Sequence, residues 1–365
     1  MSDLFNGAFK NKTVLVTGHT GFKGSWLSIW LNEMGANVVG YSLSPYTDKD
    51  NFVLAELDKK MESVLGDIRD FKKLKEIFDY HKPEVIFHLA AQPLVRLSYE
   101  YPMETYEQNI MGTVNVLECV RKSSFVKACV LITTDKCYEN KEWVWGYRET
   151  DRLGGFDPYS SSKAACEIVA SAYRNSFFSN IDNEGAGIAT VRAGNVIGGG
   201  DWSKDRIIPD CIRALENNMP INVRNPKSTR PWQHVLEPLG GYLLLASKLL
   251  SEKGNYADAW NFGPEYNSIV PVSVVVDTLL KHWGSGSWKD IQKENSTAVH
   301  ESTLLSLDCT KAKSFLGWQP QLTLDDALKM TVDWYKSYNE GNVYEICVNQ
   351  INAYSMKLKG GKTGD

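Results

Sequence analysis

The sequence has few cysteines, no long apolar run and no excess of positive charge. Its seven cysteines lie far apart and form no Cys-x-x-Cys motif, which argues against a disulfide framework and against a zinc site. No apolar run approaches the ~20 residues that cross a bilayer, and the polar start MSDLFNGAFKNK lacks the apolar stretch of a signal peptide. These absences favour a cytoplasmic protein with reduced, mostly buried thiols, no metal and no membrane contact.

The balance of acidic and basic residues argues against nucleic acid as a partner. The chain has 40 Lys and Arg against 44 Asp and Glu, so its formal net charge is −4. Nucleic-acid binding proteins carry a basic excess that this sequence does not have. We therefore expect no nucleic-acid partner and look for a small-molecule ligand instead.

The 365 residues do contain enough apolar sequence, 43%, for a large folded protein. Short β-branched runs alternate with helical patterns, beginning with a strand at 13–17 and a helix that ends at Gly35. Further strands are expected at 38–43, 63–65, 85–89, 126–133 and 187–192, and helices at 72–80, 106–121 and 160–177. Repeated strand–helix–strand units predict an α/β fold: a doubly wound, Rossmann-like parallel sheet with helices on both faces.

After Arg192 the alternation gives way to Gly-rich and Pro-rich connections, with helices near 235–250, 272–283 and 324–337. This change predicts a first domain over residues 1–194, to which segments near 235–263 return with a strand at 260–263. A smaller, discontinuous, mixed α/β domain is expected over 195–356, laid against the carboxyl ends of the sheet. The polar, Gly-rich residues 357–365 are expected to form a disordered tail.

Three glycines, Gly18, Gly21 and Gly24, follow the first strand in the pattern Gly-x-x-Gly-x-x-Gly. Between a strand and a helix, this spacing allows a tight turn and close approach of the backbone to a pyrophosphate, and the helix N-terminus offers free N–H groups. The pattern predicts a dinucleotide site in the first domain, with an ordinary turn as the alternative. The Lys23 side chain is bulkier than the side chains found in many such loops.

The tip of the second strand bears on which dinucleotide binds. An acid there would hold the adenosine ribose of NAD, and a base would accept the 2′-phosphate of NADP. The tip reads Tyr41, Ser42, Leu43, and no Arg or Lys lies between 36 and 48, which favours NAD. Asp67 could bond the adenine amino group or could serve as a turn or helix-cap residue. The expected NAD contacts are Gly18, Thr20, Gly21, Phe22, Lys23, Gly24, Ser42, Asp67, Ile68, Leu89, Ala90, Ala91, Gln92, Tyr159 and Lys163.

Tyr159 and Lys163 are four residues apart at the start of a predicted helix, so they share a face. An ammonium close to a phenol lowers its pKa from about 10 toward working pH, which would make Tyr159 a general base. The strand before them ends at Thr133 and Thr134, where a hydroxyl could bond both the phenol and a substrate hydroxyl. Asn109 is expected to bond backbone beside this strand.

The segments TGHTGFKG, GDIRD, HLAAQ, TTDKCY, PYSSSK, VRAGNVIGGGD and RPWQHV occur in this order and resemble the extended short-chain dehydrogenase/reductase family over nearly the whole chain. Within it, the chain is most similar to the nucleotide-sugar 4,6-dehydratases, and TTDK, GNVIGGGDW and RPWQHVLEPL resemble members that act on CDP-glucose. The resemblance implies an NAD-dependent lyase that converts CDP-glucose to CDP-4-keto-6-deoxyglucose and water. It also implies a homodimer, and deoxysugar biosynthesis for a bacterial surface polysaccharide such as lipopolysaccharide O-antigen.

The resemblance further implies residue roles. Tyr159, supported by Thr134 and Lys163, would remove the proton of the sugar 4-hydroxyl while the C4 hydride passes to NAD. The 4-keto group acidifies the C5 hydrogen, water leaves from C6, and the hydride returns to C6. Asn195, Arg206 and Arg230 resemble the family's contacts to the diphosphate and sugar, for which guanidinium groups are suited.

The elimination step raises a question at Asp135 and Lys136, because the dehydratases resembled here commonly have Asp-Glu after the Thr. Asp135 can act as the acid only if burial raises its pKa. Lys136 is either a neutral amine or a cation that stabilises the enolate while Asp135 or water moves the proton.

Alternatives remain open from the sequence. They are a 4,6-dehydratase for dTDP-glucose or GDP-mannose, a nucleotide-sugar epimerase, and a dinucleotide-binding sensor without activity. Intact Thr134, Tyr159 and Lys163 favour an enzyme, and Asp135 with Lys136 favours elimination over epimerisation.

Overall fold

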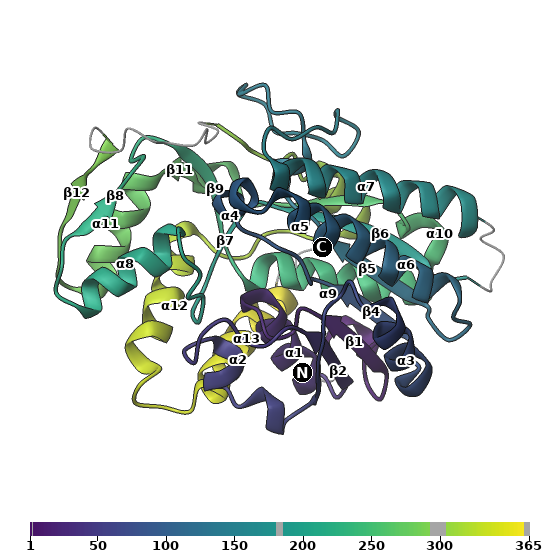
Figure 1. Ribbon diagram of the computed structural model, residues 1–365. Helices are drawn as coiled ribbons and strands as arrows, with labels where there is room; N and C mark the ends of the chain where they lie inside the picture. The colour runs from purple at the N-terminus through teal and green to yellow at the C-terminus, as the bar shows by residue number, and fades with distance from the viewer. Residues whose placement is uncertain (2, 180–184, 293–303, 361–365) are drawn as a thin grey trace.

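A parallel sheet of seven strands forms the centre of the computed structural model, which describes residues 1, 3–179, 185–292 and 304–360 (Figure 1). The strand order is β3-β2-β1-β4-β5-β6-β10, so the order reverses between β1 and β4. The strands are β1 Thr13–Thr17, β2 Asn37–Ser42, β3 Glu62–Leu65, β4 Val85–His88, β5 Ala128–Ile132, β6 Gly187–Ala193 and β10 Ala259–Phe262. This confirms the doubly wound α/β fold, and it places a ligand crevice at the carboxyl ends of the strands where the order reverses.

The strands alternate their side chains between two apolar cores, one on each face of the sheet. Val14 and Val38 are register partners in β1 and β2 and pack into one core, whereas their neighbours Leu15 and Val39 pack into the other. Since both faces are buried, the strands read as continuous apolar runs in the sequence.

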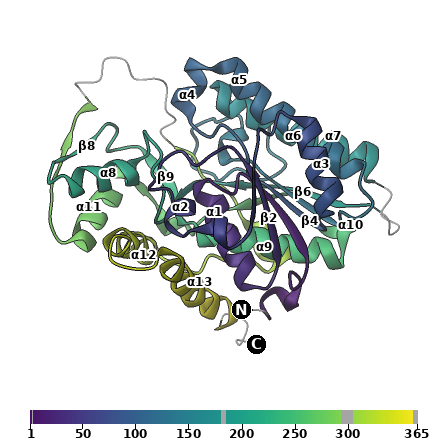
Figure 2. The same ribbon diagram turned by 60° about the horizontal axis from the view of Figure 1, so that its bottom comes forward.

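Helices cover both faces (Figures 1 and 2). Residues of α1 (Phe22–Glu33) and α9 (Leu236–Ser251) pack into one core, and those of α3 (Phe71–His81), α6 (Gly112–Arg121) and α7 (Pro158–Phe177) pack into the other. Shorter helices in the connections are α2 Asn51–Leu54, α4 Val95–Glu100, α5 Pro102–Tyr106 and α10 Lys253–Tyr256.

The helix expected at 106–121 begins earlier. Pro102 occupies the first turn of α5, a position that suits its fixed φ and missing N–H, and a π-helical turn over Glu107–Met111 joins α5 to α6.

A smaller region of mixed α/β structure lies at one end of the sheet (Figures 1 and 2). Its strands are β7 Asn195–Ile197, β9 Thr229–His234 and β11 Ile269–Pro271 in one sheet, and β8 Ile221–Val223 and β12 Trp288–Asp290 in another. Its helices are α8 Ile207–Glu216, α11 Val272–Trp283 and α12 Leu324–Ser337. Between them β10 returns to the large sheet and pairs with β6, as the sequence predicts. The domain boundaries themselves stay a prediction.

The prediction of a disordered tail from residue 357 is wrong as far as residue 360. Helix α13 spans Val343–Gly360 and packs against α1. Its buried residues Cys347, Ile351 and Tyr354 recur at helical spacing, so the helix has an apolar stripe that holds it on the core. Residues 361–365 of the expected tail lie outside the described residues.

All seven cysteines are free and buried, which confirms the expectation from their spacing. Within the described part of the chain, no helix is long and apolar enough to cross a membrane.

Candidate active site

The first glycine turn packs closely against the backbone around it. Gly18 has φ +77°, and a Cβ there would lie 2.7 Å from the backbone nitrogen of Ala90. A Cβ at Gly24 would lie 2.1 Å from the carbonyl oxygen of Gly18, so α1 packs too closely on the turn for any side chain. No side chain among the described residues caps α1. Its first N–H groups and the positive end of its dipole are therefore available to a phosphate, which fits a dinucleotide.

The tip of β2 supplies hydroxyls where the adenosine end of a dinucleotide would lie. Thr20 and Ser42 are joined by a hydroxyl–hydroxyl hydrogen bond of 2.8 Å, and Thr20 also donates to the carbonyl oxygen of Leu43. Asp67 binds Arg69 through both carboxylate oxygens, and Arg69 holds the pKa of Asp67 below its usual value. Asp67 thus stays charged; its adenine contact stays a prediction. Ile68 is buried against Gly112.

The segment after β4, from Leu89 to Gln92, faces the glycine turn. Gln92 donates its backbone N–H to Oδ1 of Asn109 at 2.8 Å, and Asn109 Nδ2 donates to the carbonyl oxygen of Gln92 at 3.1 Å. Asn109 therefore has the backbone-binding role expected from the sequence. It fixes the loop that carries Ala90 and Ala91.

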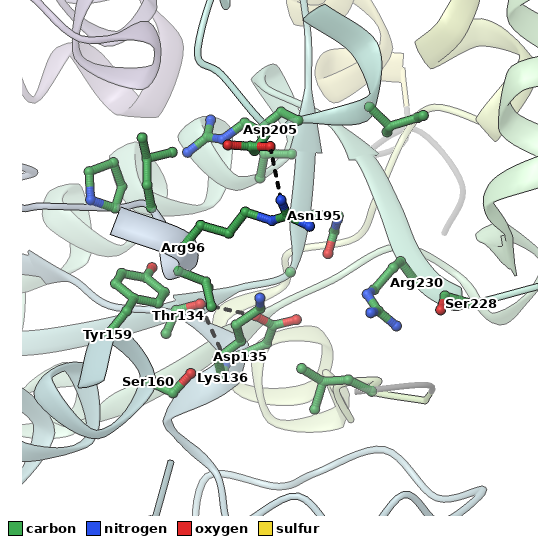
Figure 3. A pocket seen from close by; sticks show the side chains of 18 of the residues that line it. Arg96, Thr134, Asp135, Lys136, Tyr159, Ser160, Asn195, Asp205, Ser228 and Arg230 are labelled. Carbon is green, nitrogen blue, oxygen red and sulfur yellow. Dashed lines mark hydrogen bonds and ion pairs between the residues drawn. The ribbon is translucent and has the colours of Figure 1, made fainter. Parts of the chain in front are cut away.

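A cleft of about 980 Å³ opens between the carboxyl ends of the large sheet and the smaller region. That volume lies at the upper end of the usual range for ligand sites, and a nucleotide sugar is a large ligand. Eight of the residues that we predicted from the sequence line it together, and Figure 3 shows six of them as labelled sticks. They are Lys23, Thr134, Asp135, Lys136, Tyr159, Asn195, Arg206 and Arg230.

Tyr159 lies in the first turn of α7, a helix whose start is strongly fixed. The carboxylate of Asp157 caps the helix by accepting from the N–H of Ser160 at 2.8 Å, and Pro158 occupies the first helical position. The phenol is buried in the cleft wall, with the side chain of Thr134 as a hydrogen-bond partner.

The pKa expected for Tyr159 is wrong for the chain without its ligands. Burial raises the pKa of Tyr159 to about 12, and the hydrogen bond with the Thr134 hydroxyl only partly opposes this. Lys163 is not among the main groups that act on this pKa, and its buried Nζ donates to the carbonyl oxygen of Ile132 at 3.1 Å. Burial also lowers the pKa of Lys163. Removing the phenolate from water therefore raises the pKa of Tyr159 by more than the surrounding groups lower it.

Asp135 meets the condition that the sequence set for an acid. It is buried, and burial raises the pKa of its carboxyl above the usual value, against the lowering effects of Lys136, Thr134, Arg230 and Lys23. Its Oδ1 accepts the Thr134 hydroxyl at 3.0 Å, while Oδ2 has no hydrogen-bond partner among the described residues. A carboxyl in this setting can hold a proton and donate it into the cleft.

Two lysines of the cleft, Lys136 and Lys23, lower the pKa of Asp135 by their charge. Lys136 follows it directly in the chain and lines the cleft, and its charge is the largest opposing effect on the carboxyl's pKa. Lys23, expected as a cofactor contact, lines the same cleft, and burial lowers its pKa to about 8. The helix start after the glycine turn therefore places the Lys23 ammonium in the same cleft as Asp135.

The residues expected to bind the diphosphate lie on the opposite wall, from β7, β9 and the start of α8. Arg206 forms an ion pair of 2.9 Å with buried Asp201, which raises the pKa of the guanidinium. Asn195 and Arg230 come from the adjacent strands β7 and β9.

Sequence reasoning missed Asp157 and Asp201, which position Tyr159 and Arg206. An aspartate directly before a proline was a usable signal for the cap at Asp157. Asp201 follows a Gly run and gave no separate signal. Among the described residues, no group of three His, Cys, Asp or Glu could hold a metal ion.

The fold, the glycine turn and the Thr–Tyr–Lys arrangement define a class, the extended short-chain dehydrogenase/reductases. Within it, the chain belongs to the GDP-mannose 4,6 dehydratase family, whose model matches residues 15–331.

Two named dehydratases are similar to this chain over most of its length. The chain is 53% identical over 341 residues to the CDP-glucose 4,6-dehydratase of Salmonella typhimurium, covering 93% of this chain and 94% of that protein. It is 26% identical to the dTDP-glucose 4,6-dehydratase of Xanthomonas campestris, over 88% of this chain and 93% of that one.

Solved structures show the same fold. The UDP-glucose 4-epimerase of Thermotoga maritima superposes with a TM-score of 0.75 at 24% identity, covering 90% of this chain and 100% of that one. The dTDP-glucose 4,6-dehydratase of Bacillus anthracis, solved in complex with NAD, gives a TM-score of 0.73 at 21% identity, covering 90% and 98%.

Proposed function

We propose that this protein catalyses the 4,6-dehydration of CDP-glucose, giving CDP-4-keto-6-deoxyglucose and water. The observation that carries the proposal is the 53% identity, over 93% of the chain, to a CDP-glucose 4,6-dehydratase. The similarity to the dTDP-glucose enzyme of Xanthomonas campestris is half as high over a similar length. The Asp135–Lys136 pair in the cleft supports elimination rather than epimerisation.

NAD is the cofactor in this proposal, and when bound it supplies a positively charged ring that takes a hydride from the sugar and returns it. The glycine turn, the uncapped start of α1 and the Thr20–Ser42 pair would hold it. The remaining expected contacts are Phe22, Lys23, Asp67, Ile68, Leu89, Ala90, Ala91, Gln92, Tyr159 and Lys163.

Tyr159 then accepts the proton of the sugar 4-hydroxyl. Thr134 partners the phenol oxygen, and Lys163 holds the carboxyl end of β5 through Ile132. Burial keeps the phenol protonated at neutral pH, so Tyr159 would act as a base where the positively charged ring that NAD supplies lies close enough to lower its pKa.

Asp135 donates the proton that lets the C6 hydroxyl leave as water, which its raised pKa and unpartnered Oδ2 support. Water in the cleft takes the C5 proton and gives one back to C5 when C6 receives the hydride, while the Lys136 ammonium stabilises the enolate formed in between. Asn195, Arg206 and Arg230 orient the diphosphate so that C4, C5 and C6 face these groups.

We also propose a homodimer that forms through α6 and α7. The apolar residues of α6, such as Val116 and Leu117, pack on the sheet. Large apolar side chains that do face outward on this side are Met111, Ile168 and Phe177, each more than half exposed. A second copy of the chain would cover them.

The proposed location is the cytoplasm. Seven cysteines without a disulfide suit a reducing compartment.

The substrate is tested by incubating the purified protein and NAD with CDP-glucose, dTDP-glucose, UDP-glucose and GDP-mannose. We expect loss of one water by mass and a 4-keto product with CDP-glucose, and little or none with the others. Turnover of dTDP-glucose without CDP-glucose would overturn the substrate assignment. Cofactor binding without turnover of any sugar would favour a sensor.

A further inference from the structure

Arg96 and Asp205 form an ion pair that spans the cleft. Arg96 belongs to α4, just after the loop that faces the glycine turn, and Asp205 belongs to the segment before α8. Arg96 Nη1 lies 3.6 Å from Asp205 Oδ1. Figure 3 shows the Arg96 side chain reaching toward Asp205 within the cleft that also holds Asn195 and Arg230. The pair thus links the cofactor side of the site to the substrate side.

Asp205 keeps a cation partner without Arg96. Nη1 of Arg224 lies 2.5 Å from the same oxygen, Oδ1 of Asp205, and Nη2 of Arg224 donates to the backbone oxygen of Asp205. Since Arg224 already neutralises this carboxylate, separating Arg96 from it leaves no lone negative charge. The Arg96–Asp205 contact is therefore the weaker of the two and the easier to exchange.

The Arg96 guanidinium is only partly satisfied. Its Nε is buried and has no hydrogen-bond partner among the described residues. The 3.6 Å contact to Asp205 is longer than the about 2.7–2.9 Å of a charge-assisted hydrogen bond. A guanidinium offers five N–H donors in a rigid fork that matches a phosphate group. Arg96 therefore presents donors that the chain by itself does not fill.

We propose that Arg96 is a further substrate-binding residue, which exchanges Asp205 for the diphosphate of the nucleotide sugar when the substrate enters. The inference rests on the proposed function, because the diphosphate is that of a CDP-hexose. A diphosphate carries more charge than the carboxylate that it displaces, and it offers several oxygens to the guanidinium fork. Before the substrate enters, Asp205 holds Arg96 in place across the cleft.

Two substitutions separate the roles of the pair. Arg96→Gln removes the cation from the cleft. Asp205→Asn removes the competing carboxylate, and because Asp205 has φ +61°, asparagine is among the residues best tolerated there. Arg96→Lys keeps the charge and removes the fork. Arg148→Gln serves as the matched control, since Arg148 is exposed, pairs with Asp151 and does not line the cleft.

The test measures binding of CDP and of cytidine, which lacks the diphosphate, by calorimetry. Arg96→Gln should weaken CDP binding by about 10- to 100-fold, the loss expected for a hydrogen bond to a charged group, and leave cytidine within about twofold. Arg96→Lys should fall between wild type and Arg96→Gln. Asp205→Asn should bind CDP more tightly than wild type. In turnover of CDP-glucose, Arg96→Gln should raise KM far more than it lowers kcat.

The proposal is overturned if Arg96→Gln binds CDP within twofold of wild type, or if CDP and cytidine weaken equally, which would indicate a structural role. It is also overturned if Asp205→Asn weakens CDP binding as Arg96→Gln does. If wild type binds CDP but does not convert CDP-glucose, the proposed function fails while the Arg96 result still stands. If UDP, dTDP or GDP binds in place of CDP, wild type and the variants are compared with that nucleotide. If none of the nucleotides binds, both the proposed function and the role of Arg96 are overturned.

Discussion

The hydroxyl of Thr134 donates a hydrogen bond of 3.0 Å to one oxygen of Asp135, and the other oxygen of that carboxyl is buried without a partner among the described residues. Thr134 also partners the Tyr159 phenol, so one threonine touches both groups that we assign to proton transfer. This arrangement places the proposed base of the first step and the proposed acid of the second within one connected set of side chains.

Replacing Asp135 by Asn should stop elimination after oxidation of the sugar. Asparagine keeps the shape of the side chain and its contact with Thr134 but cannot give up a proton at the C6 oxygen. Loss of a general acid costs about 10²- to 10⁴-fold in rate. Rapid quench and mass spectrometry of the bound sugar measure the effect, and water loss at the wild-type rate would contradict it.

The pH profile should also report Asp135. Since burial raises its pKa, the acid form persists above the usual range for an aspartate, and elimination slows as pH rises through that raised pKa. In Asp135→Asn this alkaline limb should disappear from the residual activity. If the variant shows the same fall in activity at high pH, that fall reports the titration of another group.

Lys136→Ala should slow exchange of the sugar C5 hydrogen with solvent deuterium by about 10²-fold or more, because the enolate loses the positive charge that we assign to stabilising it. Lys136→Arg keeps that charge and should retain more exchange than the alanine variant. NMR of recovered sugar nucleotide follows the exchange. Exchange at the wild-type rate in Lys136→Ala would remove this residue from the mechanism.

Two glycines of the turn should respond differently to alanine. A Cβ at Gly24 would lie 2.1 Å from the Gly18 carbonyl oxygen, which is backbone and cannot move aside, so Gly24→Ala should cost about 3 kcal/mol or more of stability without any ligand. At Gly21 the same atom is 3.4 Å away, so Gly21→Ala should leave the free protein nearly as stable. Urea unfolding measures the stability, and NAD titration measures the binding. If Gly24→Ala unfolds like wild type, the packing of α1 on the turn is misassigned.

Acid should destabilise the protein through His88. The ring is fully buried between Thr17 and Thr113, and burial lowers its pKa to about 3, so the unfolded chain binds the proton first as pH falls below about 6.5. Stability is therefore complete above that pH and is lost below it, by about 3 kcal/mol from this residue on reaching pH ~4.5. His88→Asn, which retains a partner for Thr17, should show a smaller loss between pH ~7.5 and pH ~4.5 in urea unfolding. Equal losses in both proteins would show that His88 is not the group that titrates.

The sequence was sufficient where local chemistry decides the structure. The apolar runs at Val14–Val16 and Val85–Phe87 predicted buried parallel strands, and the three glycines predicted the close turn that Gly18 and Gly24 form. The requirement that burial raise the pKa of Asp135 could be stated from the elimination step, which needs an acid at neutral pH, and the structure meets it.

The parts that sequence reasoning missed depend on contacts between distant segments. Arg96 and Asp205 meet only because the smaller region lies over the carboxyl ends of the sheet. The pKa of Tyr159 depends on how much protein surrounds the phenol and on where the Lys163 ammonium points, and neither follows from their spacing. Helix α13 had a readable stripe at Cys347, Ile351 and Tyr354, but the polar, Gly-rich end of the chain concealed how far it extends.

The account is tested most directly by following one labelled hydrogen. CDP-glucose carrying deuterium at C4 is incubated with the protein, and the product is analysed by NMR and mass spectrometry. We predict that the deuterium is found on C6 of the 4-keto-6-deoxy product in nearly every molecule, even in ordinary water. Loss of the deuterium to solvent, or a dehydrated sugar that still carries it on C4, would contradict the account.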